Sequence, residues 1–371
     1  MRGLILLPLL AVGILALKGL PSWGQRPAEV WVRVLLKEAK EPVVVKTPEG
    51  EVSLRRSLPG GVWAEGKVVE SLVLEGPFRL DGRSYRGSLW VLPSMSGLFL
   101  INALPLEEYL LGVLPGEMPG GFPQEALMAQ AVLARTYAVH RLNPQAPYDL
   151  CATELCQVYG GMGVETPVHR RAVEATSGQV VSLPAGPGVH QAISALYHSD
   201  SGGMTAGSEE VYGRFVPYLR PRPDPFSPKR AWEVRVSWRS LLGVWPSGPK
   251  QPRQGNTKGL SEALSVPSSE EEAFALLKRS ESGRAYRIRV WGREMEGPEA
   301  TRFLRALGLP STLIEEVQAG PEGLTIRGRG AGHGLGLSQW GARGMAEAGY
   351  GYREILGYYF PGTFLSNLAA R

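Results

Sequence analysis

The stretch GVLPGEMPGGFPQEALMAQAVLARTYAVH, residues 112–140, decides the fold, because it joins a Pro/Gly-rich loop to a long and nearly uncharged segment. Pro123 suits the first helical position, and Glu125 suits the first turn, where the helix dipole favours acidic side chains. We expect a helix that ends near Leu142. Its apolar residues fall on several sides, so the sequence predicts that the helix is buried.

A single carboxylate, Glu117, precedes this helix in the Pro/Gly-rich loop, next to Leu114, Met118 and Phe122. If these apolar neighbours also surround it in space, loss of water raises its pKa above the usual value of about 4.3. A pKa of about 6 to 7 would suit a general acid at neutral pH. The residues alone also allow a loop carboxylate that pairs with an arginine.

Length and composition predict a folded protein of one large domain or two to three smaller ones. The 371 residues are 43% hydrophobic and 20% charged, which is typical of globular chains rather than disordered ones. The net charge of +5 slightly favours anionic partners such as cell wall. We expect no nucleic-acid partner, because no run of basic residues and no basic–aromatic interleaving occurs.

The N-terminal segment, residues 1–24, has one arginine followed by an apolar stretch from Leu4 to Leu17. This pattern predicts a secretory signal peptide, since the apolar core is shorter than the roughly 20 residues of a spanning helix. An uncleaved N-terminal anchor is the alternative. In either case we expect an exported protein, found in the periplasm, in the cell wall or on the outer face of the membrane.

The remaining pattern predicts an α+β fold. Residues 28–100 contain short β-branched and aromatic runs separated by turn residues, which indicates a β-rich N-terminal domain. Residues 101–371 predict a mixed domain with helices packed against strands, including a more variable segment at 230–326 and a glycine-rich loop followed by two helices. The proline-rich stretch at 218–229 predicts an extended and exposed segment.

Three polar stretches stand out in this apolar chain: the one around Glu117, the one at 197–201, and the one at 333–340. Polar loops on a rigid scaffold are frequent functional sites. His198 and His333 are candidate sugar donors, proton carriers or metal ligands, although a lone histidine more often has a structural role. Tyr197 and Trp340 suit either stacking on a sugar ring or packing.

Two cysteines, Cys151 and Cys156, stand five residues apart in DLCATELCQVYGG. In an exported protein this pair predicts a short disulfide, and half of a zinc site is the competing interpretation. The G-x-S-x-G and H-E-x-x-H patterns are absent from the sequence, so neither a serine hydrolase nor a zinc hydrolase of those types is supported.

Several motifs in order closely resemble the stage II sporulation protein D (SpoIID)/LytB family. The resemblance is strongest from about Leu104 to Arg220 and from Arg327 to Thr363. It rests on LPLEEYLLGVLPGEMP, FPQEALMAQAVLARTYAV, CQVYGG, YHSDSGGMT, VPYL, GRGAGHGLGLSQWGARGMAEAG and ILGYYFPGT.

The resemblance implies a peptidoglycan lytic transglycosylase that cleaves the bond between N-acetylmuramic acid (MurNAc) and N-acetylglucosamine (GlcNAc). Glu117 matches the family's catalytic acid, which acts alone as acid and then as base and leaves a 1,6-anhydroMurNAc end. Gln130 and Arg135 would support the site from the following helix. The resemblance also implies six substrate-binding residues: Tyr197, His198, Ser201, His333, Ser338 and Gln339.

The implied partners are peptidoglycan glycan strands and a cell-wall amidase, with membrane contact only through an uncleaved N-terminus. The name LytB implies the alternative function, a non-catalytic amidase enhancer that binds the wall and activates a partner hydrolase.

One departure bears on cofactors. Zinc-binding family members carry histidines beside the cysteines, whereas here Leu155 precedes Cys156 and no histidine lies between His140 and the pair. Two thiolates alone make a poor four-ligand site, so we expect a Cys151–Cys156 disulfide and no cofactor rather than zinc.

Overall fold

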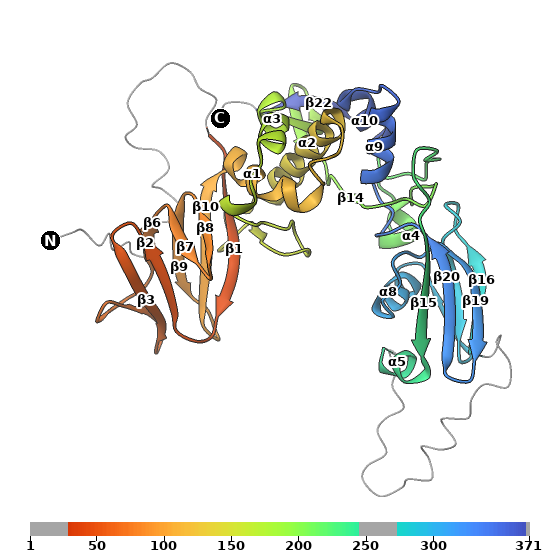
Figure 1. Cartoon of the computed structure of the whole chain (residues 1–371), viewed down its shortest axis with the longest axis horizontal. Helices are drawn as coiled ribbons and strands as arrows, with labels where there is room; N and C mark the ends of the chain where they lie inside the picture. Colours follow the sequence, from red (N-terminus) through yellow and green to blue (C-terminus); the bar gives the residue numbers. More distant parts are fainter. Residues whose placement is uncertain (1–28, 245–272, 369–371) are drawn as a thin grey trace, which may run out of the picture. The chain divides into compact units, whose positions relative to one another are not determined.

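The computed structural model describes residues 29–244 and 273–368 (Figure 1). The predicted signal or anchor, residues 1–24, lies outside these ranges. The chain divides into two compact units: unit 1 comprises Met1–Ala195 and Phe364–Arg371, and unit 2 comprises Leu196–Thr363. Helices and several sheets occur together and the N-terminal part is rich in strands, which confirms the predicted α+β fold class.

Two sheets form the N-terminal part of unit 1. The first contains, in order, β11 (Leu150–Cys151), β1 (Trp31–Ala39), β10 (Leu98–Pro105), β9 (Ser88–Pro93) and β6 (Leu72–Glu75). The second contains β5 (Lys67–Val69), β4 (Gly61–Ala64), β3 (Gly50–Ser57), β2 (Val43–Thr47), β7 (Phe78–Leu80) and β8 (Arg83–Tyr85). Val32 and Val34 of β1 are fully buried while Trp31 is half exposed, which is the alternation expected of a strand with one face on a core.

The helices of unit 1 follow the first sheet without a linker. They are α1 (Leu106–Glu117), α2 (Gln124–Arg141), the 3₁₀ turn η1 (Met162–Val164) and α3 (Pro167–Ala175). All residues of α2 from Ala126 to Ala138 are buried except Met128, which confirms the predicted buried helix. Because β10 leads directly into α1, the boundary expected near residue 100 lies inside unit 1.

A third sheet packs against α2 and uses a strand from far along the chain. It contains β13 (Val189–Ala192), β12 (Gln179–Gly186) and β22 (Phe364–Asn367), and β12 pairs antiparallel with both neighbours. In Figure 1 the blue strand β22 accordingly lies among the helices of unit 1.

Unit 2 begins with a short parallel pair, β14 (Tyr197–His198) and β21 (Leu337–Ser338). Unit 2 also contains α4 (Ser208–Tyr212), and the helices α9 (Gln339–Glu347) and α10 (Tyr352–Tyr359), which contact β21. The last two confirm the pair of helices predicted after the glycine-rich loop.

An α/β module, described at residues 231–244 and 273–329, is inserted in the sequence between these parts of unit 2. One sheet has the order β15 (Ala231–Ser237), β20 (Gly323–Arg329) and β19 (Ile314–Gly320). The other has the order β16 (Phe274–Arg279), β17 (Ala285–Val290) and β18 (Arg293–Glu296), and the helices are α5 (Trp238–Gly243) and α8 (Pro298–Ala306).

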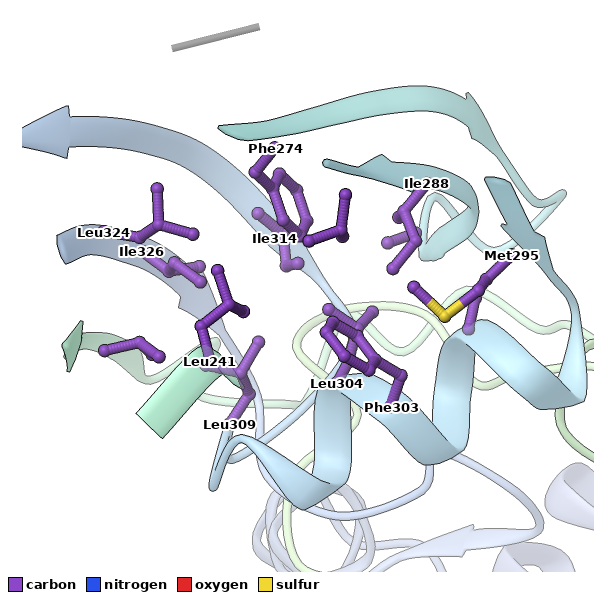
Figure 2. Close-up of a cluster of buried hydrophobic side chains, with 14 of the residues drawn as sticks. Leu241, Phe274, Ile288, Met295, Phe303, Leu304, Leu309, Ile314, Leu324 and Ile326 are labelled. Atoms are coloured by element: carbon purple, nitrogen blue, oxygen red, sulfur yellow. The ribbon is translucent and has the colours of Figure 1, made fainter. Parts of the chain in front are cut away.

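Figure 2 shows the core of this inserted module. Phe303 and Leu304 of α8 lie among strand residues such as Ile288, Ile314 and Ile326, all of which are almost completely buried. These buried residues form one cluster, so the module has a hydrophobic core of its own. Burial of one such side chain contributes about 1.5 to 3 kcal/mol to stability. Within the described ranges, no helix has the length and hydropathy needed to cross a membrane.

Candidate functional site

Glu117 is the last residue of helix α1, which corrects its predicted position in a loop. Pro115 lies inside the helix, yet the helix continues because the amide of Met118 donates to the carbonyl of Leu114 at 3.0 Å. Leu114 and Met118 are fully buried, so tertiary packing overrides the helix-breaking tendency of the Pro-Gly pair. The half-buried Glu117 carboxyl is therefore carried by a packed helix rather than by a mobile turn.

Two glycines of α1 allow the segment Gln157–Gly161 to approach the helix closely. A Cβ atom on Gly112 would lie 2.5 Å from the ring of Tyr159, and one on Gly116 would lie 3.1 Å from the side chain of Val158. The amide of Gly160 also donates to the carbonyl of Gly112 at 3.0 Å. The absence of side chains at these glycines thus fixes the distance between segment and helix.

This segment supplies a hydrogen bond to the candidate catalytic carboxyl. The amide of Val158 donates to Oε1 of Glu117 at 3.1 Å. The next residue anchors the segment, since the phenol of Tyr159 donates to Oδ1 of Asn102 at 3.0 Å. Burial raises the pKa of Tyr159, and its phenol is protonated at neutral pH.

A disulfide joins Cys151 and Cys156, with 5.4 Å between their Cα atoms. Cys151 belongs to β11, which pairs in parallel with β1, so the bond ties the start of the Gln157–Gly161 segment to the first sheet. In the part of the chain that the structure describes, no group of three or more His, Cys, Asp or Glu side chains is placed to hold a metal ion.

His169 holds the residue that follows Glu117. Its Nε2 lies 2.8 Å from the carbonyl oxygen of Met118, and its Nδ1 lies 2.7 Å from Oγ1 of Thr166, the N-cap of α3. His169 is 3% exposed. Sequence reasoning missed this role, because the contact joins residues 51 positions apart and no local pattern marks it.

Arg135 has the acceptor that its apolar helix requires. Its Nε and Nη2 donate to the two carboxylate oxygens of Glu107, each at 2.7 Å, and Nη1 donates to the carbonyl of Gln179 at 3.2 Å. The Arg135 side chain is fully buried, so this bidentate pair lets a guanidinium remain inside unit 1.

In unit 2, the β14–β21 pair brings two of the predicted polar stretches together. Tyr197 pairs with Leu337 and His198 pairs with Ser338. The amide of Trp340 also donates to the carbonyl of Ser199 at 3.0 Å. The stretches 197–201 and 333–340, more than 130 residues apart in sequence, therefore form one local structure.

Ser201 and Ser338 are fully buried in this structure. The hydroxyl of Ser201 donates to Oδ2 of Asp224 at 2.7 Å, and Oγ of Ser338 accepts from the amides of Ser201 and Gly341, each at 3.2 Å. Burial raises the pKa of Asp224. The two hydroxyls thus hold the polar stretches and the start of α9 in place.

His198 and His333 lie side by side, with 5.7 Å between ring centroids. Nδ1 of His198 is 3.0 Å from the carbonyl oxygen of Leu335, whereas Nδ1 of His333 accepts from the Leu335 amide at 3.0 Å. Burial lowers the pKa of His198 well below its usual range, and lowers that of His333 to about 4 with help from the charges of Arg305 and Arg284. Both imidazoles are therefore neutral at pH 7.

The remaining candidates in unit 2 are half-buried. They are Tyr197 in β14, Gln339 at the start of α9, and Trp340. The guanidinium carbons of Arg230 and Arg343 lie 3.8 and 5.0 Å from the centroid of the Trp340 ring. Trp340 therefore makes cation–π contacts within unit 2, in keeping with the packing role left open by the sequence.

The predicted site residues are divided between the units. Glu117 and the cysteines belong to unit 1, and the six residues expected to bind substrate belong to unit 2. Within unit 2 the structure brings His198, Ser201, His333 and Ser338 together.

Comparison with known proteins identifies the family. Residues 94–183 match the family model SpoIID, described as stage II sporulation protein. An uncharacterized protein of Brachyspira hyodysenteriae is 31% identical over 306 residues, which cover 82% of this chain and 77% of that protein. The chain belongs to the SpoIID family.

Two relatives of this SpoIID-family chain carry descriptive names. The amidase enhancer of Bacillus subtilis is 28% identical over 325 residues, 78% of this chain and 45% of that protein. Stage II sporulation protein D of the same organism is 28% identical over 287 residues, 73% of this chain and 77% of that protein. The chain thus spans less than half the length of the amidase enhancer.

The family match covers the site residues of unit 1. The matched residues 94–183 include α1, α2, Glu117 and the disulfide.

Sequence reasoning missed Asp224, because this residue stands in the proline-rich stretch predicted to be exposed, whereas its side chain is buried. An acid between two prolines, PDP, carries no local signal that a serine 23 residues away will donate to it.

Proposed function

We propose that this SpoIID-family protein is an exported lytic transglycosylase that cleaves MurNAc–GlcNAc bonds of peptidoglycan. Family membership supports a cell-wall related function. The disulfide suits a compartment outside the cytoplasm. One observation supports the catalytic part most strongly: the Glu117 carboxyl stands at the end of a packed helix, and the Val158 amide fixes one of its oxygens.

In this proposal Glu117 first gives a proton to the glycosidic oxygen, and the bond between that oxygen and C1 of MurNAc breaks. The Glu117 carboxylate then takes the proton of the MurNAc C6 hydroxyl, whose oxygen forms the new bond to C1. The products are a GlcNAc hydroxyl end and a 1,6-anhydroMurNAc end. The sugar supplies the nucleophile, so this reaction differs from glycosidases that need a second carboxylate.

The local structure around Glu117 suits a group that must act twice on one substrate. Its position at the C-terminus of α1 places it at the negative end of the helix dipole, which favours the protonated acid. The Val158 hydrogen bond instead favours the carboxylate. In the proposed reaction the first influence suits the proton-donating step and the second suits the proton-accepting step.

We further propose that the polar stretches of unit 2 bind the glycan. Tyr197, His333 and Gln339 are half-buried and present neutral donors and acceptors, which suit the hydroxyl and acetamido groups of sugars. His198, Ser201 and Ser338 are buried, and their hydrogen bonds hold these stretches in shape.

The test is digestion of purified glycan strands with the full chain, with mass spectrometry of the products. We expect 1,6-anhydroMurNAc ends from the wild type and a loss of roughly 100- to 10,000-fold in Glu117→Gln. Glu108→Gln, on the same helix, is the matched control and should retain activity. Absence of anhydro ends from the wild type would refute the proposed activity.

The amidase enhancer of Bacillus subtilis favours one alternative, a non-catalytic protein that activates a wall amidase. That function would be indicated if neither the wild type nor Glu117→Gln produced new ends, while both bound the wall and accelerated a purified amidase to the same extent.

A further inference from the structure

Arg284 of the inserted module stands in the loop before β17, in a region for which the sequence predicted no functional residue. It is 2% exposed, although it is a long and charged side chain. Buried arginines are rare unless a specific set of acceptors surrounds them. The acceptors of Arg284 therefore indicate what it does.

Two of the three acceptors are main-chain carbonyls at or just after the polar stretch 197–201, and the third belongs to the inserted module itself. Nη1 donates to the carbonyl of Met204 at 2.9 Å and to Oγ of Ser282 at 3.3 Å, and Nη2 donates to the carbonyl of Ser201 at 3.0 Å. A Cβ atom on Gly334 would lie 2.5 Å from Nη2, so the guanidinium also rests against the backbone beside His333. One side chain thus contacts two glycine-rich stretches of unit 2, residues 201–204 and residues 333–336.

The charge of Arg284 has no direct carboxylate partner among the described residues. Its acidic neighbours act without direct contact: Glu210, whose Oε2 accepts from the hydroxyl of Ser282 at 2.5 Å, and Asp200. Burial lowers the pKa of Arg284 to about 10, which leaves it charged at neutral pH. That charge is one of the causes that lower the pKa of both His198 and His333.

We infer that Arg284 is a positioning residue through which the inserted module fixes the two glycine-rich stretches of unit 2 against each other. Main-chain carbonyls accept its hydrogen bonds, so its side chain sets backbone positions directly. The part of this inference that concerns glycan binding rests on the proposed function. The geometric part does not depend on it.

The test compares Arg284→Gln and Arg284→Lys with a matched control, Arg287→Gln. Arg287 is three residues away on β17, is partly exposed and pairs with Glu296. The full-length variants would be compared in thermal unfolding, in NMR titration of the His198 and His333 imidazoles, and in binding to purified glycan strands.

For a folded Arg284→Gln we expect the His333 titration midpoint to rise from about 4, because a neighbouring positive charge is lost. We also expect glycan binding to weaken by about tenfold or more, since the two stretches lose their common anchor. Arg284→Lys should keep the low midpoints, because the charge remains, yet bind less tightly, because a lysine cannot span both carbonyls. Arg287→Gln should resemble the wild type in every measurement.

Wild-type midpoints and wild-type glycan binding in folded Arg284→Gln would overturn the inference. If that variant does not fold, wild-type binding by Arg284→Lys would overturn it instead. Should the wild type itself bind no glycan, the proposed function fails. The geometric part of the inference is then tested on its own. It stands if Arg284→Gln changes the imidazole midpoints and the backbone chemical shifts of residues 201–204 and 333–336, and it fails if both stay as in the wild type.

Discussion

The segment beside Glu117 in unit 1 and the glycine-rich stretches of unit 2 are held in different ways. Unit 1 uses a disulfide and close helix packing, and its buried Arg135 is neutralised by both oxygens of Glu107. Unit 2 uses hydrogen bonds from Arg284 to carbonyls, with no carboxylate at ion-pair distance among the described residues. The buried charge of unit 1 is thus internally compensated, whereas that of unit 2 acts on neighbouring titratable groups. We therefore expect unit 1 to respond most to broken pairs and unit 2 to pH.

Breaking the ion pair of unit 1 should have the largest effect on stability. Glu107→Ala leaves the Arg135 guanidinium, which is fully buried, without its carboxylate. We expect a loss of roughly 3 to 5 kcal/mol in the free energy of unfolding, measured by denaturant titration. Glu108→Ala, one position along α1, is the control and should cost far less. Equal losses in the two variants would show that Arg135 does not depend on this carboxylate.

Acidification should destabilise the protein through the imidazoles of unit 2. His333 has a folded-state pKa of about 4, below the ordinary value of 6.5, so between these values the unfolded chain binds a proton that the folded chain does not. Its stabilising contribution is complete above about pH 6.5, falls as the pH falls, and is lost near pH 4, with a limit of roughly 3 kcal/mol. Urea unfolding at pH 7 and pH 4.5 measures this loss, which should shrink in His333→Gln. An unchanged pH dependence in that variant would contradict the prediction.

Removal of the disulfide should have a smaller effect. The two cysteines are five residues apart, and closing so short a loop stabilises the folded state by only about 2 kcal/mol in the chain-entropy model. We expect Cys151→Ser/Cys156→Ser to unfold at lower denaturant concentration and to form fewer anhydro ends, because the Val158 amide is less well fixed. The control is Leu155→Ser, an exposed substitution between the two cysteines. Full product formation by the double variant would show that helix packing alone holds Val158.

Local patterns predicted much of this fold, and long-range contacts account for what they missed. The helix after Pro123 was predictable because its start signal and apolar residues lie in one window, and the cysteine pair is equally local. The helical position of Glu117 was not predictable, because burial of the neighbouring residues outweighs the helix-breaking tendency of the Pro-Gly pair. The contact of Arg284 with Ser201 spans 83 residues, and the strands that join the polar stretches are only two residues long. No short sequence pattern predicts either feature.

The strand β22 also has a consequence for the order of folding. Ser182 of β12 and Ser366 of β22 share a hydrogen bond although 184 residues separate them, and the whole of unit 2 lies between. The sheet against α2 can therefore be completed only after all of unit 2 has been synthesised and β22 has paired with β12. Closing so long a loop has a high entropic cost. A nascent chain would hold α2 with one sheet edge open, and it would need protection from unwanted strand pairing until β22 pairs with β12.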